Sequence, residues 1–259
     1  MEEELSVVLL QCDLSWENPS ENRTQIESYL ECVKNVDIVL LPEMFTTAFS
    51  VNAIHLAEPM DGESVLWMKE IAKLKQFVLC GSMMIKENGN IYNRLLWVDP
   101  NGVVQYYDKR HLFGLINEEK NFTPGKTRLI IDYKGWKICP LICYDLRFPV
   151  FSRNDVAYDV SFYLANWPDT RITAWDVLLK ARAIENQAYI IGLNRVGVDG
   201  YNESYSGHSQ VINPCGEVIT MAPENELGLI EVSLSKKHLS HTRKRVPFLE
   251  DRDGFELQI

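Results

Sequence analysis

Three residues of this chain, Glu43, Lys109 and Cys143, carry side chains that together could cleave an acyl compound, and each follows a stretch typical of a strand. A cysteine nucleophile needs a base that takes its proton, and the tetrahedral intermediate needs positive charge or N–H donors beside its oxygen. A carboxylate and an ammonium group meet these needs. Such a set of residues requires no histidine.

Cys143 stands where the apolar, strand-like run Trp136–Ile142 changes abruptly into polar, turn-capable residues. A strand that ends there delivers the thiol to a sharp corner, half out of the core, where a nucleophile can meet its substrate. The alternative is a buried structural cysteine, which is the commoner role of this residue type. Cys139 lies four residues earlier, inside the strand pattern, and is expected to be an ordinary core thiol.

Glu43 and Lys109 have comparable positions. Glu43 follows the short apolar run 37–42, and carboxylates just past a parallel strand occupy the usual ligand-binding place of α/β sheets, although Glu after Pro is also common in plain loops. Lys109 opens the irregular segment 108–125, which also contains Glu118. Long irregular loops inside compact domains are usually functional, the alternative being a solvated surface loop.

Other cysteine chemistry finds less support. Of the five histidines only His111 lies in the charged loop, and Cys143 lacks the flanking glycines of the α/β-hydrolase elbow. The six cysteines are scattered, without paired C-x-x-C motifs or a histidine cluster at zinc-ligand spacing. We therefore expect reduced thiols and no structural metal.

Composition bounds the class of protein. A chain of 259 residues with 46% hydrophobic content can bury a full core, and we expect residues 1–259 to form one domain. The formal net charge of -10 disfavours nucleic acid and anionic membranes as partners. The N-terminal stretch is acidic where a signal peptide is basic, and the apolar run 5–10 is too short to span a membrane, which predicts a cytoplasmic protein.

The elements that must position these residues follow from hydrophobic periodicity. Strands are expected over residues 5–12, 37–42, 77–85, 91–98, 103–107, 128–133, 136–142, 160–165, 189–194, 209–212, 218–221 and 227–232. Helices are expected over residues 20–33, 62–75, 148–154 and 170–186. The order predicts a parallel β-α-β unit that continues into an antiparallel meander, and therefore an α/β protein with mixed sheets. A polar loop is expected up to Gly207, and the polar tail 233–259 is expected to pack across a neighbouring surface.

Three segments, L-P-E-M-F, Y-D-K-R-H-L-F and L-I-C-Y-D-L-R-F-P, resemble in order and spacing those of the nitrilase or carbon–nitrogen hydrolase superfamily, along essentially the whole chain. The resemblance implies that Glu43 is the general base, Lys109 the oxyanion stabiliser and Cys143 the nucleophile, and that no cofactor is needed. A second glutamate of the family falls on Glu118, with its neighbour Glu119 as the alternative. The resemblance also implies a four-layer α-β-β-α sandwich and a homodimer or higher homo-oligomer packed through helices.

Later segments, among them A-N-W-P-D-T-R over 165–171, resemble the bacterial branch similar to omega-amidases, which hydrolyse the terminal amide of 2-oxoglutaramate. The implied activity is an amidase that releases ammonia through a cysteine thioester. The alternatives are a nitrilase, an amidase for another small amide, and a catalytically silent binding subunit on the same fold.

A substrate of this kind carries a carboxylate far from the amide, and a buried anion is costly unless a cation or several N–H donors pair with it. The candidates are Arg171, which we favour, then Arg195, and finally Arg147, which could instead brace the nucleophile turn through Asp145.

Three further residues complete the expected substrate site. The N–H of Tyr144 is expected to help hold the oxyanion, because it belongs to the residue after the nucleophile. Trp167 and Phe45 could form apolar walls around a short methylene chain, although either could be plain core.

Overall fold

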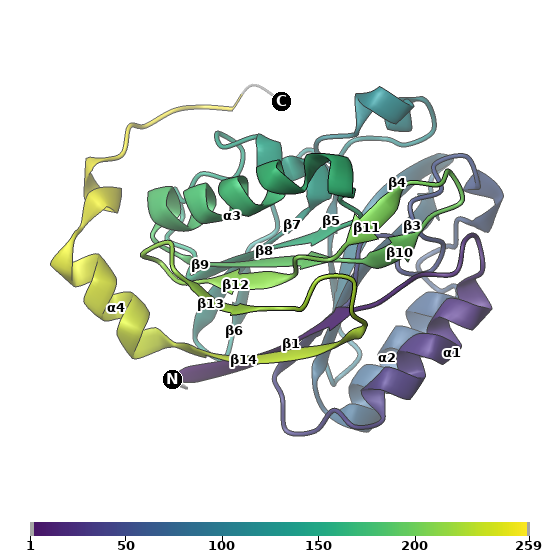
Figure 1. The fold of residues 1–259 in the computed structure, drawn as a ribbon, viewed down its shortest axis with the longest axis horizontal. Coiled ribbons are helices and arrows are strands. Elements are labelled where there is room, and N and C mark those ends of the chain that lie inside the picture. The colour runs from purple at the N-terminus through teal and green to yellow at the C-terminus, as the bar shows by residue number, and fades with distance from the viewer. Residues whose placement is uncertain (1–2, 258–259) are drawn as a thin grey trace.

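The computed structural model of the protein describes residues 3–257 and contains two six-stranded mixed sheets (Figure 1). The first sheet consists, in spatial order, of β14 (Gly228–Ser235), β1 (Glu4–Gln11), β2 (Ile38–Leu40), β3 (Val78–Glu87), β4 (Asn90–Val98) and β5 (Val104–Asp108). The second consists of β13 (Val218–Met221), β12 (Gln210–Ile212), β9 (Tyr189–Asn194), β8 (Val160–Ala165), β7 (Trp136–Ile142) and β6 (Ile131–Tyr133). A separate hairpin pairs β10 (Val196–Val198) with β11 (Ser204–Ser206).

Helices cover the outer faces of both sheets, as Figure 1 shows. The α-helices are α1 (Pro19–Leu30) and α2 (Glu63–Lys75) beside the first sheet, α3 (Ile172–Asn186) beside the second, and α4 (Lys236–Arg245) near the C-terminus. Short 3₁₀ helices span Ile54–Leu56, Gly114–Ile116, Glu118–Lys120, Cys143–Arg147, Asp169–Arg171 and Phe248–Asp251. Within residues 3–257, no helix is both long enough and apolar enough to cross a membrane.

The side chains of strand β1 pack into two different hydrophobic cores. Successive side chains of a strand point to opposite faces of the sheet. Leu5, Val7 and Leu9 belong to the core between the two sheets, while Val8 and Leu10 belong to the core beneath α1 and α2. A strand buried on both faces therefore reads as a nearly continuous apolar run. The four-layer α-β-β-α arrangement that was expected is confirmed.

The strand directions also agree with the sequence pattern. Strands β1, β2 and β3 are parallel, and β3, β4 and β5 form the antiparallel meander. In the second sheet β7, β8 and β9 are parallel. The carboxyl ends of β2, β7 and β8 therefore deliver Glu43, Cys143 and Asn166 to one region of the molecule, which is where open α/β sheets bind ligands.

The prediction of a helix over residues 148–154 is wrong. The chain instead forms a 3₁₀ helix at Cys143–Arg147 and then turns without a regular helix. Phe148 has non-helical backbone dihedral angles, φ −114° and ψ 84°, because the following Pro149 disfavours the helical region.

Two other segments differ from expectation. The polar loop before Gly207 contains the β10–β11 hairpin, and the polar tail contains α4. Both are held by contacts distant in sequence: Val196 N donates to Cys12 O, and Arg243 of α4 donates to Asp159 and to the carbonyl of Gln187. Local periodicity carries no signal of such contacts.

Candidate active site

Cys143 lies at the sharp corner that follows β7. Its backbone has φ +41°, a left-handed conformation that is uncommon for residues other than glycine and costs about 1–3 kcal/mol. The corner is capped by Asp145, whose carboxylate accepts a hydrogen bond from Ile142 N at 3.0 Å. The thiol is 8% exposed, whereas Cys139 within the strand is fully buried. Cys143 is therefore slightly more accessible than Cys139, although it is not half out of the core as expected.

Glu43 lies just past β2 and is fully buried. Its Oε1 accepts hydrogen bonds from Asn93 Nδ2 and from Lys109 Nζ, both at 2.9 Å, and its Oε2 accepts from the backbone N–H of Asn166 at 2.9 Å. Asn166 also donates from its side chain to the backbone carbonyl of Glu43 at 2.6 Å. The carboxylate is therefore fixed in orientation by donors from both sheets.

Lys109 is buried between two carboxylates. Its Nζ lies 2.9 Å from Glu43 Oε1 and 2.9 Å from Glu118 Oε2. Burial lowers the pKa of the Lys109 ammonium, but the negative charges of Glu118 and Glu43 outweigh it and leave the pKa above its ordinary value. The side chain therefore remains a cation in spite of its burial.

Glu118, and not Glu119, belongs to this cluster. Glu118 is buried and also accepts a hydrogen bond from Phe113 N at 2.6 Å, while Glu119 is exposed. Burial raises the pKa of the Glu118 carboxyl, Lys109 lowers it, and the charge of Glu43 raises it again, with a net upward shift. The turn at Asn117 points Glu118 inward and leaves Glu119 at the surface, and this geometry favours Glu118 as the second glutamate.

The Cys143 thiol lies beside this cluster, with Sγ 3.9 Å from the carbonyl oxygen of Asn166. Burial raises the pKa of this thiol well above its ordinary value, and the charge of Glu43 raises it further against the opposing effect of Lys109. The resting sulfur is therefore protonated at neutral pH, and a nucleophilic reaction at this position needs a base.

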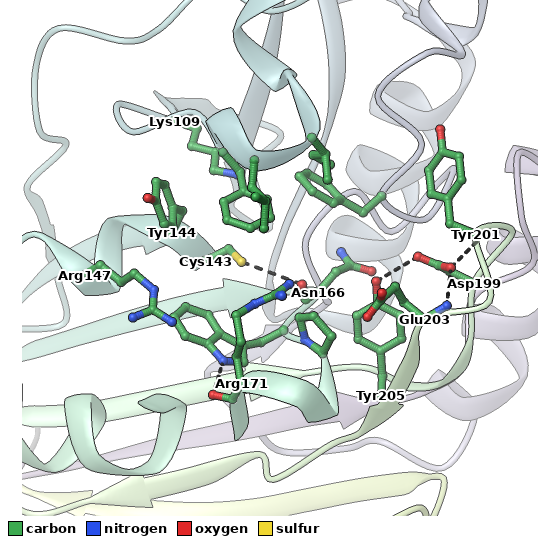
Figure 2. A pocket seen from close by; sticks show the side chains of 16 residues that line it. Lys109, Cys143, Tyr144, Arg147, Asn166, Arg171, Asp199, Tyr201, Glu203 and Tyr205 are labelled. Atoms are coloured by element: carbon green, nitrogen blue, oxygen red, sulfur yellow. Dashed lines mark hydrogen bonds between the residues drawn. The ribbon is translucent and has the colours of Figure 1, made fainter. Parts of the chain in front are cut away.

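A cavity of about 190 Å³ opens in front of the thiol (Figure 2). Among the expected substrate-site residues, Tyr144, Trp167 and Arg171 line it, and so does Arg147. Further walls come from the loop segments on either side and from the β10–β11 hairpin, with Phe49, Phe113, Leu115, Ile116, Asn166, Pro168, Asp199, Tyr201, Glu203 and Tyr205.

Phe45 does not line the cavity, contrary to expectation. It packs in the core beneath α1 and α2, with its ring centroid 6.0 Å from that of Trp67. Phe49 lines the cavity instead, and its ring centroid lies 4.9 Å from Lys109 Nζ. The chain takes left-handed turns at Met44 and Ala48, and these turns send Phe45 back to the core.

The three candidate arginines have different surroundings. Arg195 is fully buried, donates to the carbonyls of Val196 and Leu14, and pairs with Asp13, so that it is turned away from the cavity. This placement excludes Arg195 as the reader of a substrate carboxylate.

Arg171 and Arg147 do face the cavity. The Arg171 guanidinium lies 5.3 Å from the ring centroid of Phe113, and that of Arg147 lies 4.8 Å from the ring of Trp167. Among residues 3–257 neither guanidinium has a carboxylate partner. The bracing contact that was considered between Arg147 and Asp145 is not formed.

Sequence reasoning missed several polar residues of the site. Asn166 follows β8 as Glu43 follows β2, so the same strand-end rule could have found it. Asn93 is a polar residue inside an apolar strand, which is a weaker signal. Asp199 and Glu203 reach the cavity through the hairpin, whose position the sequence does not reveal. Across the described residues, no group of three or more His, Cys, Asp or Glu side chains is arranged to hold a metal ion.

The four-layer sandwich is the fold of solved nitrilase-superfamily proteins. Residues 6–244 match the carbon–nitrogen hydrolase family, and the chain belongs to that family. It is 42% identical over 253 residues to the omega-amidase YafV of Escherichia coli K12, with 98% of each chain covered. It is 32% identical over 252 residues to the 2-oxoglutaramate amidase of Bacillus subtilis, with 95% of this chain and 96% of the relative covered.

Solved structures agree with this assignment. A CN-hydrolase superfamily protein of Xanthomonas campestris, described with an arsenic adduct in its active site, is 40% identical and superposes with a TM-score of 0.97 over 99% of this chain and 100% of that one. A nitrilase-superfamily member of Saccharomyces cerevisiae shares the fold at 24% identity, with a TM-score of 0.86 over 95% of both chains.

Proposed function

We propose that the protein is an amidase that hydrolyses the terminal amide of a small ω-amide acid, of the 2-oxoglutaramate type, to a carboxylate and ammonia. The observation that carries this proposal is the cavity itself. It places a thiol beside a buried carboxylate–ammonium cluster at one wall, and it holds two guanidinium groups, Arg147 and Arg171, that have no carboxylate partner among the residues the structure describes. The names of the relatives at 32% and 42% identity support the same activity.

The proposed reaction begins with proton transfer from Cys143 to Glu43. The sulfur then attacks the amide carbon, and the carbonyl oxygen becomes an oxyanion. Lys109 Nζ lies within hydrogen-bonding distance of three carboxylate oxygens, Glu43 Oε1 and both oxygens of Glu118, and one of the two N–H bonds directed at Glu118 would turn to this oxygen. Tyr144 is the second residue of a 3₁₀ helix, so its N–H lies before the first intrahelical hydrogen bond and can donate as well.

Collapse of the intermediate completes the acylation step. Glu43 returns the proton to the leaving nitrogen, the carbon–nitrogen bond breaks, and ammonia departs. Glu43 then takes a proton from water, which attacks the thioester and releases the acid and the thiol. In this scheme Glu118 keeps Lys109 charged and in place, and the site needs no cofactor.

The distal carboxylate of the substrate would lie between Arg171 and Arg147. Trp167 and Phe49 supply apolar surface for the methylene chain between the two polar ends. A carboxylate buried in a small cavity gains from charge-assisted hydrogen bonds to guanidinium groups.

We also propose that the single 259-residue domain acts as a cytoplasmic homodimer. Six free cysteines favour a reducing compartment. The outer face of α3 exposes Val177 (60%) and Ile184 (51%), and Val150 and Phe248 are exposed as well. Apolar side chains on a helix face favour packing against a second copy.

Ammonia release from a matched panel tests the proposed activity. The panel contains succinamic acid, its methyl ester, an uncharged short amide and the corresponding nitrile. We expect the free acid to be turned over with the highest kcat/KM. Faster turnover of the ester, the uncharged amide or the nitrile would favour another amidase or a nitrilase. Absence of release from every compound would favour a binding subunit.

A further inference from the structure

One buried carboxylate next to the nucleophile takes no part in the proposed proton transfers. Asp145 is fully buried and its two oxygens accept four hydrogen bonds. Oδ2 accepts from Ile142 N at 3.0 Å and from the phenol of Tyr107 at 2.7 Å. Oδ1 accepts from the backbone N–H of His111 at 3.1 Å and from His111 Nδ1 at 2.8 Å. Each oxygen of this carboxylate therefore accepts two hydrogen bonds, as a buried carboxylate requires.

The donors come from two separate segments. Ile142 immediately precedes Cys143, whereas Tyr107 and His111 lie two residues on either side of Lys109. A single side chain therefore joins the segment that carries the nucleophile to the segment that carries the ammonium group.

Two further contacts join the same segments. The His111 ring is stacked on Phe148, with centroids 3.7 Å apart and an interplanar angle of 3°. Burial, followed by the charge of Asp145, raises the pKa of the Tyr107 phenol well above its ordinary value, so this group remains a donor throughout the neutral range. The two segments are therefore joined by ring stacking as well as by hydrogen bonds.

We propose that Asp145 is a positioning residue, which fixes the Cys143 sulfur and the Lys109 ammonium relative to each other and so sets the geometry of the oxyanion site. The inference rests on the proposed amidase function. It also explains how the left-handed conformation of Cys143 persists, because a strained backbone is retained only where its surroundings determine it. Misplacement of reacting groups by about 1 Å can cost on the order of 10²-fold in rate.

Asp145→Asn tests this role. The new amide would place an N–H₂ group where one carboxylate oxygen stood, so the variant loses the hydrogen bond from the backbone N–H of either His111 or Ile142. We expect kcat for succinamic acid to fall by about 10²–10³-fold, the size associated with the loss of one oxyanion donor. The KM should change by less than about threefold, because the cavity walls that bind the substrate are untouched.

A transition-state probe separates positioning from general damage. Succinic semialdehyde presents an aldehyde carbon where succinamic acid presents its amide. The Cys143 sulfur adds to that carbon, the thiol proton passes to Glu43, and the carbonyl oxygen becomes an oxyanion at the Lys109 site. We expect Asp145→Asn to raise the inhibition constant of this aldehyde by about the same factor as the loss in kcat, and that of the product succinate by less than about threefold.

Milder variants cover the case in which Asp145→Asn does not fold. Tyr107→Phe and His111→Phe each remove side-chain donors to Asp145 and keep an aromatic ring, and each should show the same pattern with a smaller amplitude. Asp159→Asn is the matched control, since Asp159 is also a buried carboxylate but anchors α4 through Lys236 and Arg243. Its thermal stability should fall while kcat and the aldehyde inhibition constant stay near those of the unmutated protein.

The outcomes are distinct. Equal weakening of aldehyde and succinate inhibition in the variants, or a kcat that stays within about threefold of the original, would overturn the positioning role. If the unmutated protein neither hydrolyses succinamic acid nor binds the aldehyde through Cys143, the proposed function itself fails.

Discussion

Lys109 Nζ and Glu43 Oε1 form a fully buried ion pair, 2.9 Å apart, at the wall of the cavity that contains the thiol. Buried ion pairs contribute little net stability, because the cost of removing both charges from water offsets their attraction. Here the carboxylate of Glu118 pairs with the same ammonium group. The arrangement is therefore better explained by its effect on neighbouring groups than by stabilisation of the fold, and that effect can be measured at Cys143.

Glu43→Gln should separate thiol reactivity from amide hydrolysis. Hydrolysis needs the Glu43 base, so we expect kcat to fall by about 10²–10⁴-fold. The negative charge of Glu43 raises the pKa of the thiol, and its removal lowers that pKa toward the ordinary value. Alkylation requires the thiolate, so its rate at Cys143 should rise at a lower pH in the variant than in the unmutated protein.

Site-resolved mass spectrometry after iodoacetamide treatment between pH 6 and 10 (roughly the range that brackets an ordinary thiol pKa) measures this shift. The exposed Cys215 provides an internal reference whose pH dependence should not move. Glu119→Gln, at the exposed neighbour of the cluster, is the matched variant and should leave both quantities unchanged. Retention of full hydrolysis by Glu43→Gln would show that another group is the base.

The strand-end positions of Glu43, Lys109 and Cys143 were predictable, because hydrophobic periodicity marks where a strand ends and parallel strands end on one side. The directions of side chains beyond those ends were not. Phe45 and Phe49 belong to the same short loop, and only the left-handed turns at Met44 and Ala48 decide which of them reaches the cavity.

Long-range packing explains the other omissions. The β10–β11 hairpin is seated by close approaches between its glycines and the N-terminal segment: a Cβ at Gly200 would lie 2.4 Å from Trp16, and one at Gly197 would meet Asp13. Helix α4 has a polar sequence with little of its surface buried, and it depends on ion pairs from Lys236 and Arg243 to Asp159. Such contacts join residues that are far apart in sequence.

Gly125 should be required for the position of Lys109. A Cβ at this residue would lie 2.0 Å from the carbonyl oxygen of Asp108, and Gly125 N donates to Lys109 O at 2.9 Å. Gly125→Ala must therefore push this segment away from the strand end that carries the ammonium group. We expect a loss of about 1–3 kcal/mol in the free energy of unfolding and at least about a tenfold fall in kcat.

Thermal or urea unfolding and steady-state kinetics measure both effects. Gly228→Ala is the control, because no heavy atom of the described part of the chain, apart from its sequence neighbours, lies within 4 Å of the added Cβ there. If Gly125→Ala kept the kcat of the Gly228→Ala protein, the backbone contact with Lys109 would have no role in the reaction.

Arg171 and Arg147 should distinguish charged from uncharged amides. A charge-assisted hydrogen bond is worth about 1.5–3 kcal/mol, so loss of Arg171 should lower kcat/KM for succinamic acid by roughly 10–100-fold. The loss for the methyl ester should be much smaller, since it offers no carboxylate. Arg147→Ala should show the same preference, and Arg245→Ala on the exposed face of α4 should show no effect. Equal losses on the acid and the ester would mean that neither arginine reads the carboxylate.

Glu203 should weaken the binding of the same anionic substrate. Its carboxylate lines the cavity together with the two arginines, and within residues 3–257 it has no cationic partner. Like charges repel across a small cavity, and the exposure of Glu203 to solvent limits the effect to about 0.2–1 kcal/mol. Glu203→Gln should therefore lower the KM for succinamic acid by up to about fivefold and leave that for the methyl ester unchanged.

The decrease in KM for succinamic acid that Glu203→Gln causes should become smaller as salt concentration rises, because screening reduces the repulsion that the variant removes. Glu226→Gln changes the net charge of the protein by the same amount at an exposed position outside the cavity, and should leave both KM values as they are. An increase in the KM for succinamic acid on Glu203→Gln would reverse the sign of this argument. It would show that Glu203 holds Arg171 or Arg147 in the orientation that receives the carboxylate.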